Sequence, residues 1–266
     1  MRLCTYRDGD GTRLGLVAGD LVEPRAAADV AAAIGGPLPP PAGEPRPLAE
    51  VELAAPLRPG KLLGIGLNYR DHAAETGAAL PAEPLVFAKL PSSVTGPGGP
   101  VVHPAYTEEL DYEGELAVVI GRRAVGVPAA RALGHVFGYA AMNDVTARDR
   151  QRAEPQWVRA KGGDTFAPFG PWVTTADEVP DPQALRIRTW VNGEPRQDGS
   201  TADMVFSVAE LIAWCSASFT LEPGDVITTG TPAGVGVARR PRSFLRPGDR
   251  VRVEVEGLGA LDHEVR

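Results

Sequence analysis

Residues 110–121 read Leu-Asp-Tyr-Glu-Gly-Glu-Leu-Ala-Val-Val-Ile-Gly, which is the alternation of a β-strand whose second half is buried. Asp111, Glu113 and Glu115 recur at every second residue, so we expect them to share one face of that strand. Like charges held this close repel one another, and burial increases the cost. A divalent cation bound by these side chains would relieve both costs. An acidic strand end that faces water is the alternative, and this stretch alone does not decide between them.

The composition of the whole chain narrows the class of protein. Its 266 residues are 43% apolar, enough to bury a sizeable core as one domain with a small appendage. The net charge of -7 argues against nucleic acid and against an anionic membrane surface as partners. The two cysteines, Cys4 and Cys215, lie far apart and are expected to be free thiols in a reducing compartment. Without a signal-like or membrane-spanning apolar run, the sequence predicts a soluble cytoplasmic protein.

Turn dipeptides and prolines divide the chain into two unequal parts. Short strands broken by Asp-Gly turns are expected over residues 1–24, and a short helix over Ala26–Ile34. Six prolines between Pro37 and Pro47 predict an extended linker. We therefore place a boundary near residue 55, between a small N-terminal domain (1–55) and a larger domain (56–266).

The C-terminal third is rich in strands. Asn192-Gly193 predicts a hairpin turn after the apolar run 185–191, and residues 206–219 have the pattern of a helix. A strand beginning at Val226 leads into a loop rich in glycine and hydroxyl groups that ends at Gly236. This loop can bind a small carboxylate through backbone N–H groups and Thr231, or it is only a tight turn. Together these segments predict a mixed, β-rich α+β fold.

His72 and Glu75 form a second candidate site. If Asn68 or Asp71 caps a helix at this point, the three-residue spacing places both side chains on one helix face. A carboxylate there fixes the imidazole tautomer and raises its basicity, which suits a pair that activates water. The alternative is an exposed polar helix with a chance pairing.

Lysine is scarce in this chain, with three among 27 basic residues: Lys61, Lys89 and Lys161. In so arginine-rich a sequence, a lysine is expected where a compact ammonium group is needed. Lys161 precedes two glycines, a setting typical of an active-site loop. Asp144, at the end of an apolar run, is a candidate oxygen ligand at a strand end. The charged segment 147–152 is predicted to be a helix that is mostly solvated.

As a set, these motifs resemble the fumarylacetoacetate hydrolase family. They occur in the family's order and spacing over about residues 60–260, in the segments 66–75, 87–93, 111–121, 138–149, 161–166, 170–171, 191–194, 221–225 and 229–234. The resemblance implies a β-roll or barrel with flanking helices, a small variable N-terminal domain and a homodimer. The short N-terminal part favours a short-chain relative of acylpyruvase or isomerase type.

The resemblance also implies roles for individual residues. Glu113, Glu115 and Asp144 would bind one Mg²⁺ or Mn²⁺, which carboxylate oxygens suit. His72 and Glu75 correspond to the family's catalytic dyad, and Lys161 to a lysine near the substrate's enolate or carboxylate. The positions expected to help hold the substrate are Lys89, Gln151 and Thr231. Asp111 does not match a ligand, and its role stays open.

The activity that the resemblance implies is hydrolysis of a C–C bond in a small 2-oxo acid of the acylpyruvate type, through an enolate that the metal stabilises. The family also contains isomerases of 5-carboxymethyl-2-hydroxymuconate and 2-hydroxyhepta-2,4-diene-1,7-dioate, and oxaloacetate decarboxylases. The His72–Glu75 pair favours hydrolysis, because decarboxylation needs less from a base that activates water. A protein that binds metal and 2-oxo acid without turnover is the non-enzyme alternative.

Overall fold

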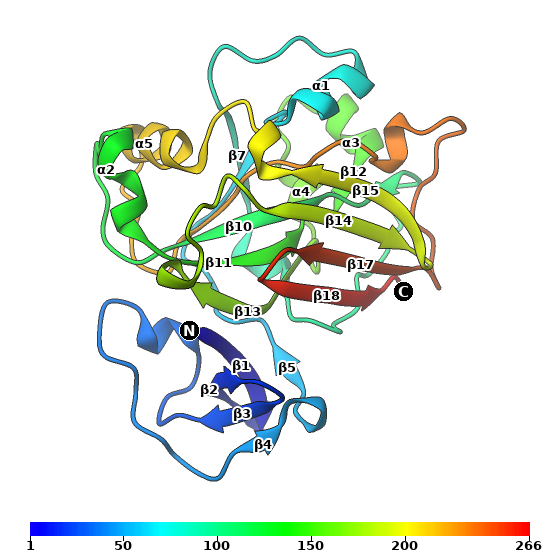
Figure 1. The fold of residues 1–266 in the computed structure, drawn as a ribbon. Helices are drawn as coiled ribbons and strands as arrows, with labels where there is room; N and C mark the ends of the chain where they lie inside the picture. The colour runs from blue at the N-terminus through cyan, green and yellow to red at the C-terminus, as the bar shows by residue number, and fades with distance from the viewer.

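The computed structural model describes residues 1–266, and a sheet of 12 strands runs through the whole molecule (Figure 1). Ten strands lie side by side in the order β4 (Arg46–Pro47), β3 (Leu21–Pro24), β2 (Gly11–Ala18), β1 (Arg2–Asp8), β13 (Ala167–Thr175), β11 (Val136–Asn143), β10 (Gly114–Ile120), β16 (Val226–Thr228), β6 (Leu62–Gly66) and β7 (Leu85–Lys89). Two short strands pair off this path, β5 (Leu53–Ala54) with β1 and β8 (Val94–Thr95) with β13. Since the path has two ends, at β4 and β7, the sheet does not close into a barrel.

A second sheet of four antiparallel strands packs against β10, β11 and β13. Its order is β15 (Glu194–Ser200), β14 (Arg186–Val191), β17 (Arg250–Val255) and β18 (Gly259–Glu264). On β10, Leu116, Val118 and Ile120 belong to the core shared with this second sheet. Ala117 and Val119 belong to the core on the other face. The alternation in the sequence of β10 is therefore confirmed, and both faces of this strand are buried.

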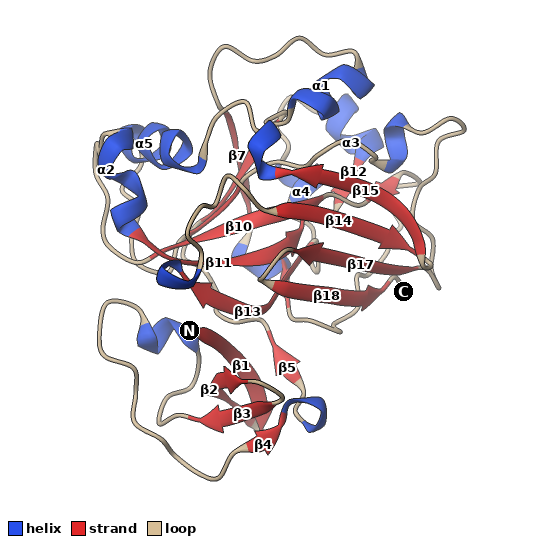
Figure 2. Cartoon of the chain, in the orientation of Figure 1, coloured by secondary structure: helices blue, strands red, loops and turns tan.

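Helices surround the sheets at their ends (Figure 2). The α-helices are α1 (Arg70–Thr76), α2 (Ala129–Ala132), α3 (Arg148–Ala153), α4 (Val158–Lys161) and α5 (Val208–Ser218). Single 3₁₀ turns occur at Val30–Ala33, Leu48–Glu50, Pro91–Ser93, Leu133–His135, Ala176–Glu178, Thr201–Asp203 and Gly236–Ala238. A two-stranded pair, β9 (Leu110–Asp111) with β12 (Thr146–Ala147), lies beside α3. None of the helices has the length and apolarity needed to cross a bilayer.

The N-terminal strands β1 to β5 form the lower part of the molecule in Figure 1. They join the rest through antiparallel pairing of β1 with β13, in which Leu3 lies opposite Val173. Leu3 and Leu14 pack in one buried cluster with residues of β10 and β11 such as Val119 and Ala140. The apolar core is therefore continuous across residue 55, where the sequence predicts a boundary.

Of two local predictions, the hairpin at Asn192-Gly193 is confirmed and the helix near the N-terminus is mostly wrong. The hairpin between β14 and β15 is confirmed, with Asn192 and Gly193 both at positive φ (54° and 78°). The helix expected over Ala26–Ile34 is wrong except for one 3₁₀ turn at Val30–Ala33. The reason is that the Val30 N–H donates to Pro56 and the Ala27 carbonyl accepts from Leu14, so neither group is free for helical hydrogen bonds.

The strand expected to run through residues 110–121 is broken at Tyr112 and Glu113, which separate β9 from β10. The backbone of Glu113 turns to the end of β11 instead. Its N–H donates to Asn143 Oδ1 at 2.9 Å, and its carbonyl accepts from the Asp144 N–H at 2.8 Å. Asp111 accordingly does not belong to the cluster of carboxylates that includes Glu113 and Glu115.

His263 on β18 gives the fold a dependence on pH. It is buried, its Nε2 accepts from Asn143 Nδ2 at 2.9 Å, and burial lowers its pKa from 6.5 to about 4. Between pH ~6.5 and 4, the imidazole of His263 is therefore protonated in the unfolded chain but neutral in the folded chain. The free energy of unfolding is highest above pH ~6.5 and decreases as the pH falls toward 4. We expect a loss of up to about 3 kcal/mol in the free energy of unfolding.

Urea titrations at about pH 7.5 and about pH 5 test this expectation. The His263→Gln variant keeps an acceptor for Asn143 but does not titrate, so its free energy of unfolding should change less between the two pH values. An equal change in parent and variant would assign the pH dependence to other groups.

Candidate active site

Three buried carboxylates meet where β10 begins and β11 ends. Glu113, Glu115 and Asp144 each place a carboxylate oxygen within 4.8 Å of the others. Their exposed fractions are 5%, 1% and 0%, so the alternative of an acidic strand end facing water is wrong. The pairing of β10 with β11 sets Gly114 opposite Asn143, which brings the residues on either side of this pair together. We call these three residues the acidic triad.

Cationic side chains compensate two members of the acidic triad. Lys161 Nζ donates to Glu113 Oε2 at 2.6 Å and to Asp144 Oδ2 at 2.7 Å, and Lys89 donates to the other oxygen of Asp144. Arg148 Nη2 lies 2.6 Å from Glu113 Oε1. Burial alone would raise the pKa of Glu113, but the charges of Arg148 and Lys161 outweigh it and lower this pKa to about 2.

Glu115 is the member of the triad without a cationic partner. It accepts hydrogen bonds from the Thr228 hydroxyl and from the Gly230 N–H (2.8 Å), but it forms no ion pair. Burial, followed by the charges of Asp144 and Glu113, raises its pKa well above the usual range. An uncompensated buried carboxylate beside two others is the environment that a hard divalent cation would satisfy. The donor set therefore fits Mg²⁺ or Mn²⁺.

His72 and Glu75 lie together on α1. Nδ1 of His72 is 2.7 Å from Oε1 of Glu75, and Oε2 of Glu75 accepts from the Gly234 N–H at 2.9 Å. The predicted cap is wrong, because Tyr69 is the N-cap residue and has no side-chain capping bond. Asp71 instead lies in the first turn, where Oδ1 accepts from the His72 N–H at 2.7 Å. Since Glu75 holds Nδ1–H, Nε2 is the basic nitrogen of His72.

A cavity of about 360 Å³ brings the two groups together. It is lined by His72, Glu113, Glu115, Arg148, Gln151, Arg152, Lys161 and Thr231, and by the less polar residues Ile65, Gly66, Leu67, Thr76, Leu85, Trp157 and Val237. Most of the residues predicted to form the site therefore face one space. Glu75, Asp144 and Lys89 are absent from the cavity wall. Lys89 is buried behind Asp144 and donates to the carbonyl of Lys161.

Gln151 and Thr231 both have partners within the protein. Gln151 Oε1 accepts from Arg148 Nη1 at 3.0 Å, which leaves its amide NH₂ free toward the cavity. The hydroxyl of Thr231 donates to the Gly114 carbonyl at 2.9 Å and accepts from Gln197 Nε2 at 2.7 Å. Thr231 therefore ties its loop to the start of β10, next to the acidic triad.

Arg148 and Asp111 are residues of the site that sequence reasoning missed. The charged segment 147–152 was expected to be mostly solvated, but Arg148 is 5% exposed and its Nε donates to Asp111 Oδ2 at 2.8 Å. Asp111 is fully buried and thus holds the arginine that contacts Glu113. Two features of the sequence could have indicated this pair. Asp111 matches none of the family's ligand positions, and an arginine follows Asp144 by four residues.

The loop after β16 contributes through its backbone. The N–H groups of Gly230, Ala233 and Gly234 donate to Glu115, Asp71 and Glu75, at 2.8, 3.1 and 2.9 Å. Those of Gly236 and Val237 donate to Asp111 at 2.8 and 3.0 Å. We call residues 230–237 the amide loop. These N–H groups bind carboxylates of the protein itself, and not the small carboxylate ligand that one of the two predictions gave to this loop.

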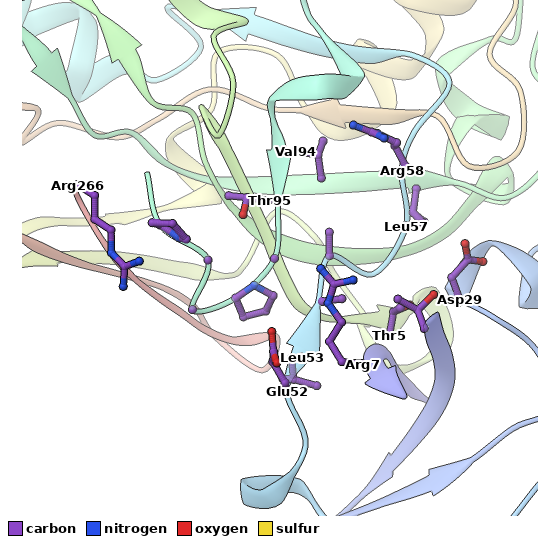
Figure 3. A pocket seen from close by; sticks show the side chains of 18 residues that line it. Thr5, Arg7, Asp29, Glu52, Leu53, Leu57, Arg58, Val94, Thr95 and Arg266 are labelled. Carbon is purple, nitrogen blue, oxygen red and sulfur yellow. The ribbon is translucent and has the colours of Figure 1, made fainter. Parts of the chain in front are cut away.

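A larger cavity of about 800 Å³ lies elsewhere, between the N-terminal strands and the 94–100 segment (Figure 3). Its lining includes groups of both signs, such as Arg7, Asp29, Glu52 and Arg58. None of the predicted site residues lines it. Size therefore does not identify the active site here, whereas the convergence of carboxylates, histidine and lysine does.

Family models and a curated relative match nearly the whole chain. Residues 61–266 match the family model described as fumarylacetoacetate (FAA) hydrolase, C-terminal, and residues 1–56 match one described as Rv2993c-like, N-terminal. Protein Rv2993c of Mycobacterium tuberculosis is 42% identical over 267 residues, which cover 100% of this chain and 98% of that protein.

Two solved structures are similar over nearly their full lengths. One is named 5-carboxymethyl-2-hydroxymuconate delta-isomerase, from Mycobacterium smegmatis, with 40% identity, a TM-score of 0.86 and coverage of 100% of this chain and 99% of that one. The other is a fumarylacetoacetate hydrolase from the psychrophile Exiguobacterium antarcticum, with 37% identity, a TM-score of 0.90 and the same coverage. The chain therefore belongs to the fumarylacetoacetate hydrolase family, whose members include hydrolases and isomerases.

Proposed function

We propose that this chain is a hydrolase that depends on Mg²⁺ or Mn²⁺ and cleaves a C–C bond in a small 2-oxo acid of the acylpyruvate type. One observation carries the proposal: His72, paired with Glu75, lines the same cavity as Glu113 and Glu115 of the acidic triad. A base able to activate water thus faces a site able to bind the chelating end of a 2-oxo acid.

Glu113, Glu115 and Asp144 would hold the divalent cation, which when bound would supply Lewis-acid stabilisation of negative charge on a 2-oxo acid. His72 takes a proton from water at Nε2, because Glu75 holds its Nδ1–H. The water oxygen attacks the acyl carbonyl, and the bond from that carbon to the CH₂ group of the pyruvate half breaks. The electron pair stays on the pyruvate half as an enolate, which takes up a proton to give pyruvate beside a free carboxylic acid.

Lys161 and Gln151 support this reaction from the cavity wall. Asp144 and Glu113 outweigh the effect of burial on Lys161 and raise its pKa, so its ammonium group stays charged. We infer that this charge stabilises the enolate of the pyruvate half. Gln151, whose carbonyl oxygen Arg148 holds, is free to donate its amide N–H to an oxygen of the substrate.

An isomerase acting on a 5-carboxymethyl-2-hydroxymuconate type of substrate is the second candidate, because a similar structure carries that name. Such a reaction needs a proton moved between two carbons and no attack by water, and His72 can serve as the carrier. Decarboxylation of oxaloacetate needs only the charge stabilisation at the triad. Metal-dependent binding without turnover is the non-enzyme candidate.

A substrate panel separates these candidates. The purified chain is assayed with acetylpyruvate, oxaloacetate and 2-hydroxyhepta-2,4-diene-1,7-dioate, each with Mg²⁺, with Mn²⁺ and with EDTA. We expect the highest kcat/KM for the acylpyruvate with either metal and loss of turnover in EDTA. A higher kcat/KM for the dienedioate would replace the hydrolase by the isomerase, and turnover that survives EDTA would remove the metal from the proposal.

A further inference from the structure

Three polar residues lie on one face of α3, and they become more exposed along the helix toward the cavity mouth. Arg148 is buried against the acidic triad, Gln151 is half-buried, and the side chain of Arg152 is 49% exposed. All three line the cavity. Residues four apart on a helix lie on the same face, about 6 Å apart along the axis. A ligand anchored at the triad and extending along α3 therefore reaches Arg152 at the cavity mouth.

Another part of the cavity wall is apolar. Ile65, Leu67, Leu85 and Trp157 provide apolar surface without charge. A substrate chain can pack on this side through its carbon atoms. Among the charged residues of the cavity wall, Arg152 is the exposed one, so it is placed to meet the far end of a substrate chain.

Arg152 is held in place but keeps donors free. Its Nη2 lies 2.7 Å from Glu109 Oε2, and this is its one ion pair. A guanidinium group has five N–H donors in a planar fork, so one carboxylate contact leaves an edge able to bind another carboxylate. Its half-buried neighbour Arg150 pairs with Asp149 and does not line the cavity.

We propose that Arg152 is a specificity-determining residue that binds a second carboxylate at the far end of the substrate. The preferred substrate is then a dicarboxylic 2-oxo acid, chelated at one end and paired with Arg152 at the other. This inference rests on the proposed function for the chelating end only. In the hydrolysis, water adds to the acyl carbonyl, the C–C bond breaks, and the products are a dicarboxylic acid and pyruvate.

Binding tests the inference without turnover. Calorimetry with Mg²⁺-loaded protein compares 2-oxoadipate with 2-oxohexanoate, which share the chelating end but differ in the terminal carboxylate. We expect 2-oxoadipate to bind more tightly, and Arg152→Gln to weaken its binding about 5- to 30-fold while 2-oxohexanoate changes less than about twofold. Arg150→Gln, the matched control on the same helix, should change neither. Equal losses for both ligands, or none, would overturn the role of Arg152.

A second variant guards against a folding defect in Arg152→Gln. Glu109→Gln removes the carboxylate that competes with the ligand for Arg152 and leaves Arg152 in place. We therefore expect 2-oxoadipate to bind more tightly to this variant and 2-oxohexanoate to bind as it does to the parent. Unchanged or weaker binding of 2-oxoadipate would also overturn the proposal. Failure of the hydrolase assignment is separate, since it would appear as no turnover of any acylpyruvate by the parent while the preference for the diacid in binding persists.

Discussion

Replacing His72 by alanine is expected to lower kcat/KM for acylpyruvate cleavage by about 10²–10⁴-fold, the usual scale for loss of a positioned general base. The reason is that no other group on the cavity wall can replace Nε2 of His72 as the base. The other polar groups there are cationic side chains, an amide, hydroxyls and the carboxylates of the acidic triad. Steady-state kinetics with Mn²⁺ at saturating metal measures the effect.

Two further measurements test whether the loss of activity in His72→Ala is the loss of a base. Oxalate, which mimics the chelating end of the substrate, should bind His72→Ala and the parent equally well, because the divalent cation that the triad would hold, and not His72, binds that end. Glu75→Gln should fall between the parent and His72→Ala, since it removes the charge that orients the imidazole but leaves the ring. An equal loss of oxaloacetate decarboxylation and hydrolysis in His72→Ala would instead point to a proton-transfer role shared by both reactions, and hydrolysis would give way to the isomerase or decarboxylase assignment.

Replacing Glu115 by glutamine is expected to abolish turnover and to weaken metal binding by more than about 100-fold, because even residues behind the ligands commonly contribute 10- to 100-fold. The fold should survive. The glutamine carbonyl can still accept from Gly230, and one of three mutually repelling buried carboxylates is removed.

Thermal and urea unfolding with and without Mn²⁺ check the second prediction. At a metal concentration about 100 times its Kd, the parent should gain about 2.7 kcal/mol in the free energy of unfolding, and the variant far less. Glu222→Gln is a matched control, since Glu222 is exposed and pairs with Arg123 on the surface. Full activity of Glu115→Gln, or activity in the presence of a chelator, would contradict the metal site.

The sequence predicts the elements that carry a strong local pattern. The two faces of β10 follow from its alternation, and the hairpin at Asn192-Gly193 follows from its turn residues. The proximity of His72 and Glu75 follows from their spacing on α1, although the residue that caps that helix does not. The mixed β-rich fold and family membership follow from the set of motifs. The domain division, the homodimer and the cytoplasmic location stay predictions.

The features that could not be predicted depend on contacts between distant segments. The break after β9 arises because the backbone of Glu113 bonds to Asn143, thirty residues away. The burial of Arg148 depends on Asp111, and its neighbours Arg150 and Arg152 are exposed or half-buried although all three share one charged segment. The position of Lys89 behind Asp144 likewise reflects how β7 meets the triad, which no local pattern reports.

The amide loop has a consequence for how this family can vary. It holds Glu115, Glu75 and Asp111 through main-chain N–H groups, which every residue except proline supplies. Substitution is restricted mainly by shape, as at Gly234, where φ is 110° and an added Cβ would lie 2.0 Å from the Arg196 carbonyl oxygen. Apart from Thr231, whose hydroxyl donates to the Gly114 carbonyl, side chains elsewhere in the loop can thus change without disturbing the acid, base and metal positions. Alignments scored on residue identity would therefore undervalue the segment that joins both halves of the active site.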